Sequence, residues 1–193
     1  MKNKILLFLL SLLILNVIKC AKRATPTGGP RDSIPPQLIN ANPKLNTTFF
    51  DKEEFTLTFD EYVSIKDVSK QLIISPPLNS SQYKVYPTTG ASKKISLELK
   101  DSLMENTTYT FNFGESIIDF NESNATSYLT YTLSTGETID SLYIRGSILD
   151  AFQKEIEPFI SLQLYPVDST YNDSTIYTKK PLYVTSTLDT TIY

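Results

Sequence analysis

The chain of 193 residues contains no histidine, no tryptophan and a single cysteine. Without histidine it lacks the commonest general base, the usual partner of a catalytic serine or cysteine, and the commonest metal ligand. One cysteine excludes an intrachain disulfide and a thiolate metal site. Carboxylate-based catalysis and oxygen-ligated ions such as calcium remain compatible with this composition.

The chain also lacks a compact cluster of basic residues. It has 18 Lys and Arg against 21 Asp and Glu, for a formal net charge of −3. Removal of residues 1–19 would take away Lys2, Lys4 and Lys19 and shift the net charge from −3 to −6. Phosphate binding needs patches of Lys and Arg, so nucleic acid is not an expected partner. There is no phosphate-binding glycine motif, and no cofactor is predicted.

The first twenty residues have the plan of a secretory signal peptide. Lys2 and Lys4 precede the apolar run Ile5–Ile18, and Cys20 follows almost at once. The run is shorter than the roughly 18 residues of a membrane-spanning helix. A cysteine at the processing site is typical of a bacterial lipoprotein signal, which predicts cleavage after residue 19 and lipid attachment at Cys20. Lys19 departs from the small residue usual before that cysteine, and a plain cleaved signal is the alternative.

Residues 20–36 are rich in proline and glycine. Pro26, Gly28–Pro30 and Pro35–Pro36 interrupt regular structure, and no apolar period is present. This composition predicts a flexible tether that holds a folded unit away from a bilayer.

Between residues 37 and 136 apolar and polar side chains alternate with a period of two. Turn residues recur about every ten residues, and about seven short strands fit this length, which predicts an antiparallel β-sandwich of immunoglobulin-like size. The runs are Gln37–Ala41, Phe55–Phe59, Leu72–Ile74, Tyr83–Pro87, Ile95–Leu99, Tyr109–Phe113 and Leu129–Leu133.

Tyr109 stands at the start of the penultimate predicted strand, after the loop Leu103–Thr108. This position is typical of a tyrosine corner, in which the hydroxyl bonds to backbone a few residues upstream. The alternative is an ordinary buried aromatic of an alternating strand.

Several short motifs recur in one known family. They are Ile34-Pro35-Pro36, Asn42-Pro43, Phe55–Glu61, Leu103 with Asn106–Tyr109, Ile118-Asp119 with Asn124, and Leu133–Gly136. With these motifs in this order, residues 34–136 resemble the bacterial Ig-like domain of S-layer proteins and of many Bacteroidetes lipoproteins. Residues Cys20–Pro30 resemble the tether of those lipoproteins. The resemblance implies a stalk or spacer module without catalytic residues.

Residues 141–193 carry a second β pattern. Strands are predicted at Leu142–Ile144, Phe159–Tyr165 and Tyr183–Thr185, with a turn at Gln153–Pro158. The segment resembles the opening hairpin of carboxypeptidase-regulatory, prealbumin-like β-sandwiches. It is short for a domain with its own core. We expect a partial, incomplete second β-domain with an unpaired strand edge.

Two groups of acidic and amide residues are candidates for chemistry. Asp60 and Glu61 are adjacent in a predicted strand and should point to opposite faces, so they are not expected to converge on one substrate. The loop after Ile118 offers oxygen ligands for calcium from Asp119, Asn121 and Asn124, with Glu122 beside them, but lacks EF-hand spacing. A solvated loop is the alternative, and no metal site is predicted.

Two kinds of residue point to glycans. Ser33, Ser102 and Ser141 each lie between an aspartate and an apolar residue, a pattern of O-glycosylation in Bacteroidetes. Twelve tyrosines are present. Of these, Tyr62, Tyr86 and Tyr171 lie near predicted turns, where rings stack on sugars, although half-buried strand tyrosines are the alternative.

These features together predict a non-catalytic lipoprotein of the bacterial cell envelope. A lipid at Cys20 would anchor it in the outer membrane, where tethering raises the local concentration of a binding face. By analogy with the lipoproteins that the chain resembles, Ala21 in place of an aspartate favours the periplasmic face over the cell surface. The expected partners are the membrane, through the lipid, and an envelope protein or glycan. The alternatives are a surface adhesin or glycan-binding module, and an accessory domain of a longer enzyme.

Overall fold

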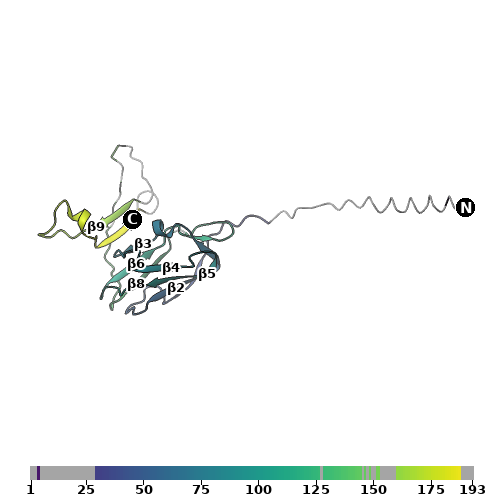
Figure 1. The fold of residues 1–193 in the computed structure, drawn as a ribbon, viewed down its shortest axis with the longest axis horizontal. Coiled ribbons are helices and arrows are strands. Elements are labelled where there is room, and N and C mark those ends of the chain that lie inside the picture. Colours follow the sequence, from purple (N-terminus) through teal and green to yellow (C-terminus); the bar gives the residue numbers. More distant parts are fainter. Residues whose placement is uncertain are drawn as a thin grey trace. The chain divides into compact units, whose positions relative to one another are not determined.

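The computed structural model describes residues 4, 29–126, 128–144, 146, 148, 151–152 and 160–187. The predicted signal peptide (apart from Lys4), Cys20 and the predicted turn Gln153–Pro158 lie outside the described residues. The chain divides into two units, Met1–Arg31 and Asp32–Tyr193. The described part of the second unit consists mainly of antiparallel β-sheet (Figure 1).

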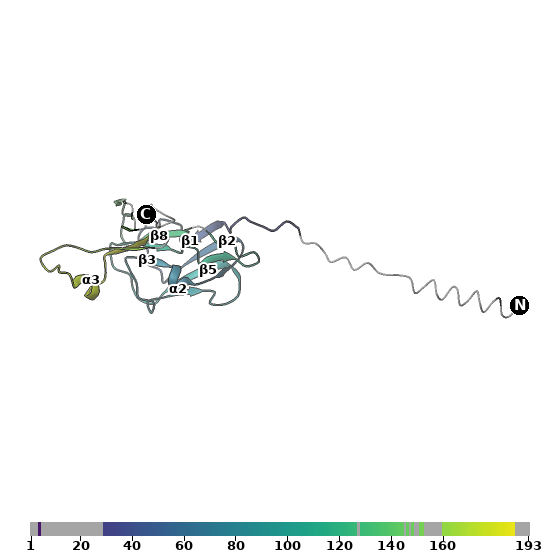
Figure 2. The same cartoon turned by 90° about the horizontal axis from the view of Figure 1, so that it is seen from above.

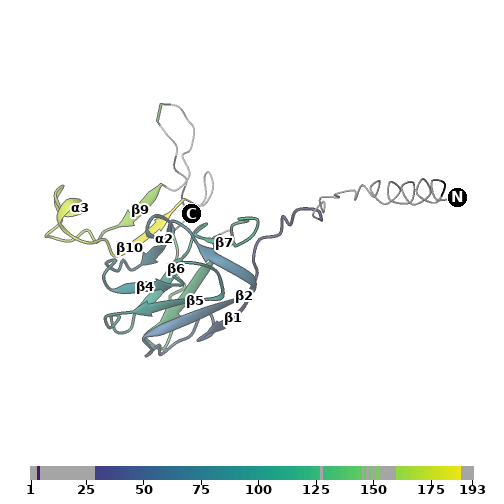
Figure 3. The ribbon, with the colours of Figure 1, turned by 45° about the vertical axis from the view of Figure 1, so that its right-hand side comes forward.

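Two sheets form the body of this unit, as Figure 3 shows. The first has the order β1-β2-β5-β4, and it consists of β1 (Leu38–Asn42), β2 (Glu54–Ile65), β5 (Ser92–Leu99) and β4 (Tyr83–Tyr86). The second has the order β3-β6-β8, and it consists of β3 (Ile73–Ser75), β6 (Thr108–Asn112) and β8 (Thr130–Ser134). All of these pairings are antiparallel.

This strand order is that of an immunoglobulin constant-type sandwich, whose sheets are ABED and CFG. In chain order, β1 to β6 take the places of strands A to F, and β8 that of strand G. The antiparallel Ig-like sandwich that the alternation predicts is therefore confirmed. One further strand, β7 (Ile117–Asp119), lies between F and G and pairs with Val63–Ile65 at the end of β2.

The segment 46–50 covers the outer edge of β8. The Asn46 N–H donates to the Thr132 carbonyl, and the Phe50 N–H donates to the Ser134 carbonyl, both at 2.9 Å. Thr47 pairs in parallel with Leu133. The chain thus leaves the first sheet after β1 and crosses to the second, so that β8 does not present an open edge.

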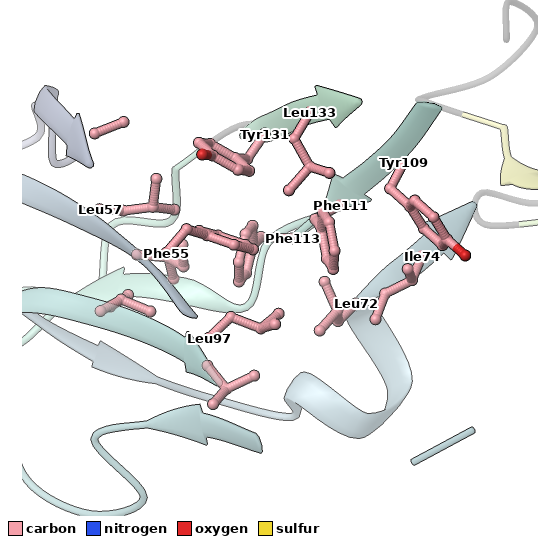
Figure 4. Close-up of a cluster of buried hydrophobic side chains, with 14 of the residues drawn as sticks. Phe55, Leu57, Leu72, Ile74, Leu97, Tyr109, Phe111, Phe113, Tyr131 and Leu133 are labelled. Atoms are coloured by element: carbon pink, nitrogen blue, oxygen red, sulfur yellow. The ribbon is translucent and has the colours of Figure 1, made fainter. Parts of the chain in front are cut away.

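The core lies between the two sheets (Figure 4). Phe55 and Leu57 face inward from β2 because alternate side chains of a strand share one face. The Phe55 ring stacks on Tyr131 of the other sheet, with 4.0 Å between ring centroids and 14° between the planes. It also meets the edge of Phe111 at 4.9 Å. Such ring pairs add about 0.5–1.5 kcal/mol beyond their burial.

The second β pattern differs from the prediction in one strand. Residues 142–144 form no strand, and Leu142 is 98% exposed. The prediction of a strand at Leu142–Ile144 is therefore wrong. No described strand pairs with this segment, and an alternating pattern without a partner strand has no ladder to join.

Two later strands form a hairpin, β9 (Ser161–Leu164) with β10 (Tyr183–Ser186). The short helix α3 (Thr175–Thr178) lies in their connection, as Figure 3 shows, and Figure 2 shows α3 from above. β10 lies beside β3, where the Val184 N–H donates to the Ser75 hydroxyl at 3.1 Å. That residues 141–193 form a domain of their own stays a prediction.

Candidate functional site

Tyr109 fixes the connection between the two sheets before β6. Its side chain is buried, and its hydroxyl accepts a hydrogen bond from the Met104 N–H at 3.1 Å. This is the hydrogen bond of a tyrosine corner. On the other side of the same loop, the Thr107 N–H donates to the Thr135 hydroxyl at 3.0 Å. Tyr109 therefore has a structural role in the fold.

Asp119 is the last residue of β7, and Asn121 and Asn124 lie in the connection that follows it. The buried Asp119 carboxylate accepts the Asn121 N–H at 2.8 Å and the Glu122 N–H at 3.0 Å. Asn124 turns its amide nitrogen to the Asp32 carbonyl at 3.0 Å. The Asp119 carboxylate, a predicted calcium ligand, therefore accepts hydrogen bonds from backbone N–H groups instead. Among the described residues, no three acidic side chains gather as a metal site.

The pKa of Asp119 reports this arrangement. Burial is the largest single cause and acts to raise it, but the hydrogen bonds from the Asn121 and Glu122 N–H groups and from the Glu122 side chain together outweigh burial. The net result is a pKa below the ordinary value of 3.8. Asp119 is thus a charged, structural carboxylate rather than a candidate general acid.

Asp60 and Glu61 lie side by side in β2 and take different roles. The Asp60 carboxylate accepts the Gln37 N–H at 2.9 Å and so holds the start of β1. The pKa of Glu61 is raised, first by burial and then by the carboxylates of Asp119, Asp60 and Asp32. Neighbouring carboxylates disfavour one another's ionisation, so this end of the domain concentrates negative charge.

An apolar patch lies among these carboxylates, and we call it the β2–β7 patch. It consists of Ile34, Tyr62 and Phe120, which are 64%, 56% and 55% exposed. Phe120 directly follows β7, and its N–H donates to the carbonyl of Tyr62 in β2 at 3.0 Å, so the two aromatic residues are neighbours where β2 and β7 pair. Asn124 donates to the Ile34 carbonyl at 3.4 Å and so brings the third residue to the same loop.

Lys93 adds a positive charge beside the aromatic rings. Its ammonium nitrogen lies 5.6 Å from the centre of the Tyr62 ring and donates to the Asp60 carbonyl at 2.6 Å. Sequence reasoning placed Tyr62 near a turn but missed Phe120 and Ile34. Ile34 lies in the segment predicted as tether, and Phe120 follows β7, a strand too short to show an alternating pattern.

Two adjoining hollows of about 500 and 520 Å³ share Lys52, Glu53 and Glu98. They combine charges of both signs, and Glu98 forms an ion pair with Lys100. The Lys100 hydrogen bond lowers the pKa of Glu98. The charged side chains of these hollows are at least partly exposed, so the hollows do not hold a buried acid or base for catalysis.

The three predicted glycosylation serines are exposed and lie outside the strands. Ser33 precedes β1, Ser102 lies in one of the two hollows, and Ser141 follows the sandwich. Asp32, next to Ser33, accepts the Ile34 N–H at 2.9 Å. The three sites are thus accessible to a modifying enzyme, and their modification stays a prediction.

The other predicted tyrosines belong to separate elements. Tyr86 in β4 is half-buried, with the Lys84 ammonium 4.9 Å from its ring centre, and Tyr171 lies between β9 and α3. Within the part of the chain that the structure describes, no helix has the length and apolar character needed to cross a membrane.

Comparison with known proteins places the chain in a family. The model of the bacterial Ig-like domain matches residues 32–135, more than half of the chain. Among solved structures, an L,D-transpeptidase from Mycobacterium smegmatis matches at 9% identity with a TM-score of 0.32. That alignment covers 67% of this chain and 65% of the other, so this chain spans less than two thirds of its length. No curated protein sequence matches. Residues 32–135 have both the strand order and the family pattern, and the chain belongs to the bacterial Ig-like domain family.

Proposed function

We propose that the chain is a non-catalytic lipoprotein of the bacterial cell envelope, in which the Ig-like domain serves as a spacer and interaction module. The observation that carries this proposal is the position of Cys20. The cysteine follows a basic start and an apolar run, and it precedes a proline- and glycine-rich tether and the Ig-like domain. Acylation of Cys20 would give the chain's single thiol a function.

We take the spacer to end where the Ig-like match begins. The Ig-like match begins at residue 32, and Pro36 is buried. The Asn124 amide also holds the Asp32 and Ile34 carbonyls. We therefore take residues 21–31 as the tether, a length of chain that can span at most about 35–40 Å. Such a reach keeps the domain near the membrane and raises its effective concentration for partners there.

The chemistry of the described residues supports a non-catalytic role. Asp119 is their one buried charged side chain, and backbone N–H groups occupy its carboxylate. The family resemblance brings no catalytic residues to this chain. We place the protein in the outer membrane on the periplasmic face, because Ala21 follows the cysteine where an acidic residue would favour the cell surface.

A glycan-binding role is the second candidate, and the exposed aromatic rings favour it. Tyr62 and Phe120 are neighbours at one end of the sandwich and present their rings to solvent. Aromatic rings at this level of exposure stack on the apolar faces of sugars. A glycan array with the wild-type chain and the Tyr62→Ser variant tests this role, which requires a glycan that the variant no longer binds.

Membrane fractionation of the native host tests the anchor. The wild-type chain should sediment with the membranes and incorporate radiolabelled palmitate. The Cys20→Ser variant should lose the label and leave the membrane fraction, whereas Lys19→Ala should retain both. A Cys20→Ser chain that stays membrane-bound would mean that the anchor is not a lipid on this thiol.

A further inference from the structure

The β2–β7 patch lies at the end of the sandwich where three inter-strand connections meet. Tyr62 stands near the end of β2, Lys93 stands at the start of β5, and Phe120 follows β7. These positions correspond to the B–C, D–E and F–G connections of an Ig domain. In immunoglobulin variable domains, the B–C and F–G loops are among those that form the binding surface at one end of the sandwich.

Exposed aromatic rings at this end are not required by the fold. The tyrosine and phenylalanine rings of the core are buried between the sheets, whereas Tyr62 and Phe120 keep more than half of their surface exposed. Ile34 lies at the same loop through Asn124. Adjacent exposed aromatic and aliphatic side chains are characteristic of an interaction surface.

Negative charge surrounds the patch. The carboxylates of Asp32, Asp60 and Asp119 lie close enough to raise the pKa of Glu61, after the larger effect of burial. The pKa of Glu122 is also raised. The hydrogen bond to Asp119 is the largest cause, and the charges of Asp119, Asp32 and Glu61 add to it. Lys93 is the cation that acts in the opposite direction on Glu61.

The negative charge around the patch determines which kind of partner it can bind. An anionic bilayer would be repelled by these carboxylates, and so would a second copy of this acidic chain. A positively charged partner gains attraction over the same surface, and the aromatic rings provide contact area for its apolar side chains.

We propose that the β2–β7 patch binds a cationic segment of another protein, one in which lysine or arginine alternates with apolar side chains. This inference deepens the interaction role proposed above and rests on it, but it does not depend on the lipid at Cys20. Tyr62 and Phe120 contact the apolar side chains, and Glu61 and Glu122 attract the basic ones.

Peptide titration of the full-length chain in mild detergent tests this site. The probes are a peptide alternating lysine and phenylalanine, a peptide alternating lysine and serine, and a peptide alternating glutamate and phenylalanine. The first should bind, the second about tenfold more weakly, and the third not measurably. Affinity for the first should fall as ionic strength rises from about 50 to about 500 mM, because salt screens exposed charges.

Two double variants separate the apolar and the charged contributions. Tyr62→Ser with Phe120→Ser should weaken binding about tenfold, as expected for truncated aromatic anchors. Glu61→Gln with Glu122→Gln should weaken it at low salt and leave it unchanged at high salt. Tyr177→Ser, at a tyrosine that is 84% exposed on α3, is the matched control and should bind as the wild type does. Unchanged thermal unfolding of each variant excludes misfolding.

Several outcomes would overturn the site. They are equal affinity of the aromatic double variant and the wild type, equal affinity for the lysine–serine peptide, and no binding of any peptide. If the patch binds phosphatidylglycerol vesicles and not the peptide, it is a membrane-binding surface, and this result would also contradict the proposed peptide site. The Cys20→Ser chain should bind the peptide normally, so failure of the lipid anchor and failure of this site are distinguishable.

Discussion

The Tyr109 hydroxyl and the Met104 N–H form a hydrogen bond of 3.1 Å that ties the loop before β6 to the body of the sandwich. Tyr109→Phe removes this bond and leaves the packing of the ring in place. We expect a loss of about 0.5–1.5 kcal/mol in the free energy of unfolding. Urea denaturation measures it, with Tyr177→Phe as the control because that hydroxyl is exposed. Equal stability of Tyr109→Phe and the wild type would show that this hydrogen bond does not stabilise the fold.

The stability of the sandwich depends on the rings that join its sheets. Phe111 is fully buried and meets Phe55 edge-on at 4.9 Å. Phe111→Ala leaves a cavity at that contact and should cost about 3–5 kcal/mol in the free energy of unfolding. Phe111→Leu should cost less, because it fills more of the cavity. Circular dichroism during thermal unfolding measures both, and a smaller loss for Ala than for Leu would contradict the packing described.

The loop after β7 should weaken in acid because of Asp119. Its pKa in the folded protein lies below the ordinary value of 3.8, so its contribution to stability is present at neutral pH. That contribution is lost as the pH falls through the folded pKa. Asp119→Asn should therefore cost about 1–3 kcal/mol at neutral pH, since a charged acceptor of two N–H groups is removed. The difference between wild type and variant should shrink at acid pH.

Urea denaturation of both proteins near neutral pH and near pH 3 measures this effect. Asp60→Asn serves as the comparison, because that carboxylate is exposed and accepts a single backbone N–H. A difference between wild type and Asp119→Asn that does not depend on pH would show that the carboxylate charge does not hold the loop.

If the three predicted serines are glycosylated, replacing each one should remove the mass of one glycan. Ser33→Ala, Ser102→Ala and Ser141→Ala, made in the native host, should each lose one glycan in the intact mass. Ser123→Ala should lose none, because this exposed serine follows a glutamate rather than an aspartate. Identical glycan mass on all four variants and the wild type would reject the three sites.

Strands with long alternating patterns were predictable from the sequence, and short elements were not. Phe55–Phe59 alternates clearly, and the structure extends this strand to Ile65, because Val63 is buried and pairs with Asp119 of β7. β7 has three residues, too few for a period of two to show. The strand predicted at Leu142–Ile144 failed because alternation does not reveal whether a partner strand exists.

The β2–β7 patch combines residues that lie far apart in the sequence. Ile34 joins it through a hydrogen bond to Asn124, and Phe120 joins it through the backbone of Tyr62. No local pattern connects these positions. The oxygen-rich loop was visible in the sequence, but its role depended on the backbone N–H groups of Asn121 and Glu122, which the residue types do not reveal.

The most direct test of the account is the intact mass of the chain recovered from the native membrane fraction. The account predicts an N-terminus at Cys20 that carries an acylated glyceryl group. A free Cys20 thiol in a soluble fraction, or cleavage at another position, would contradict it and make the protein a secreted binding module.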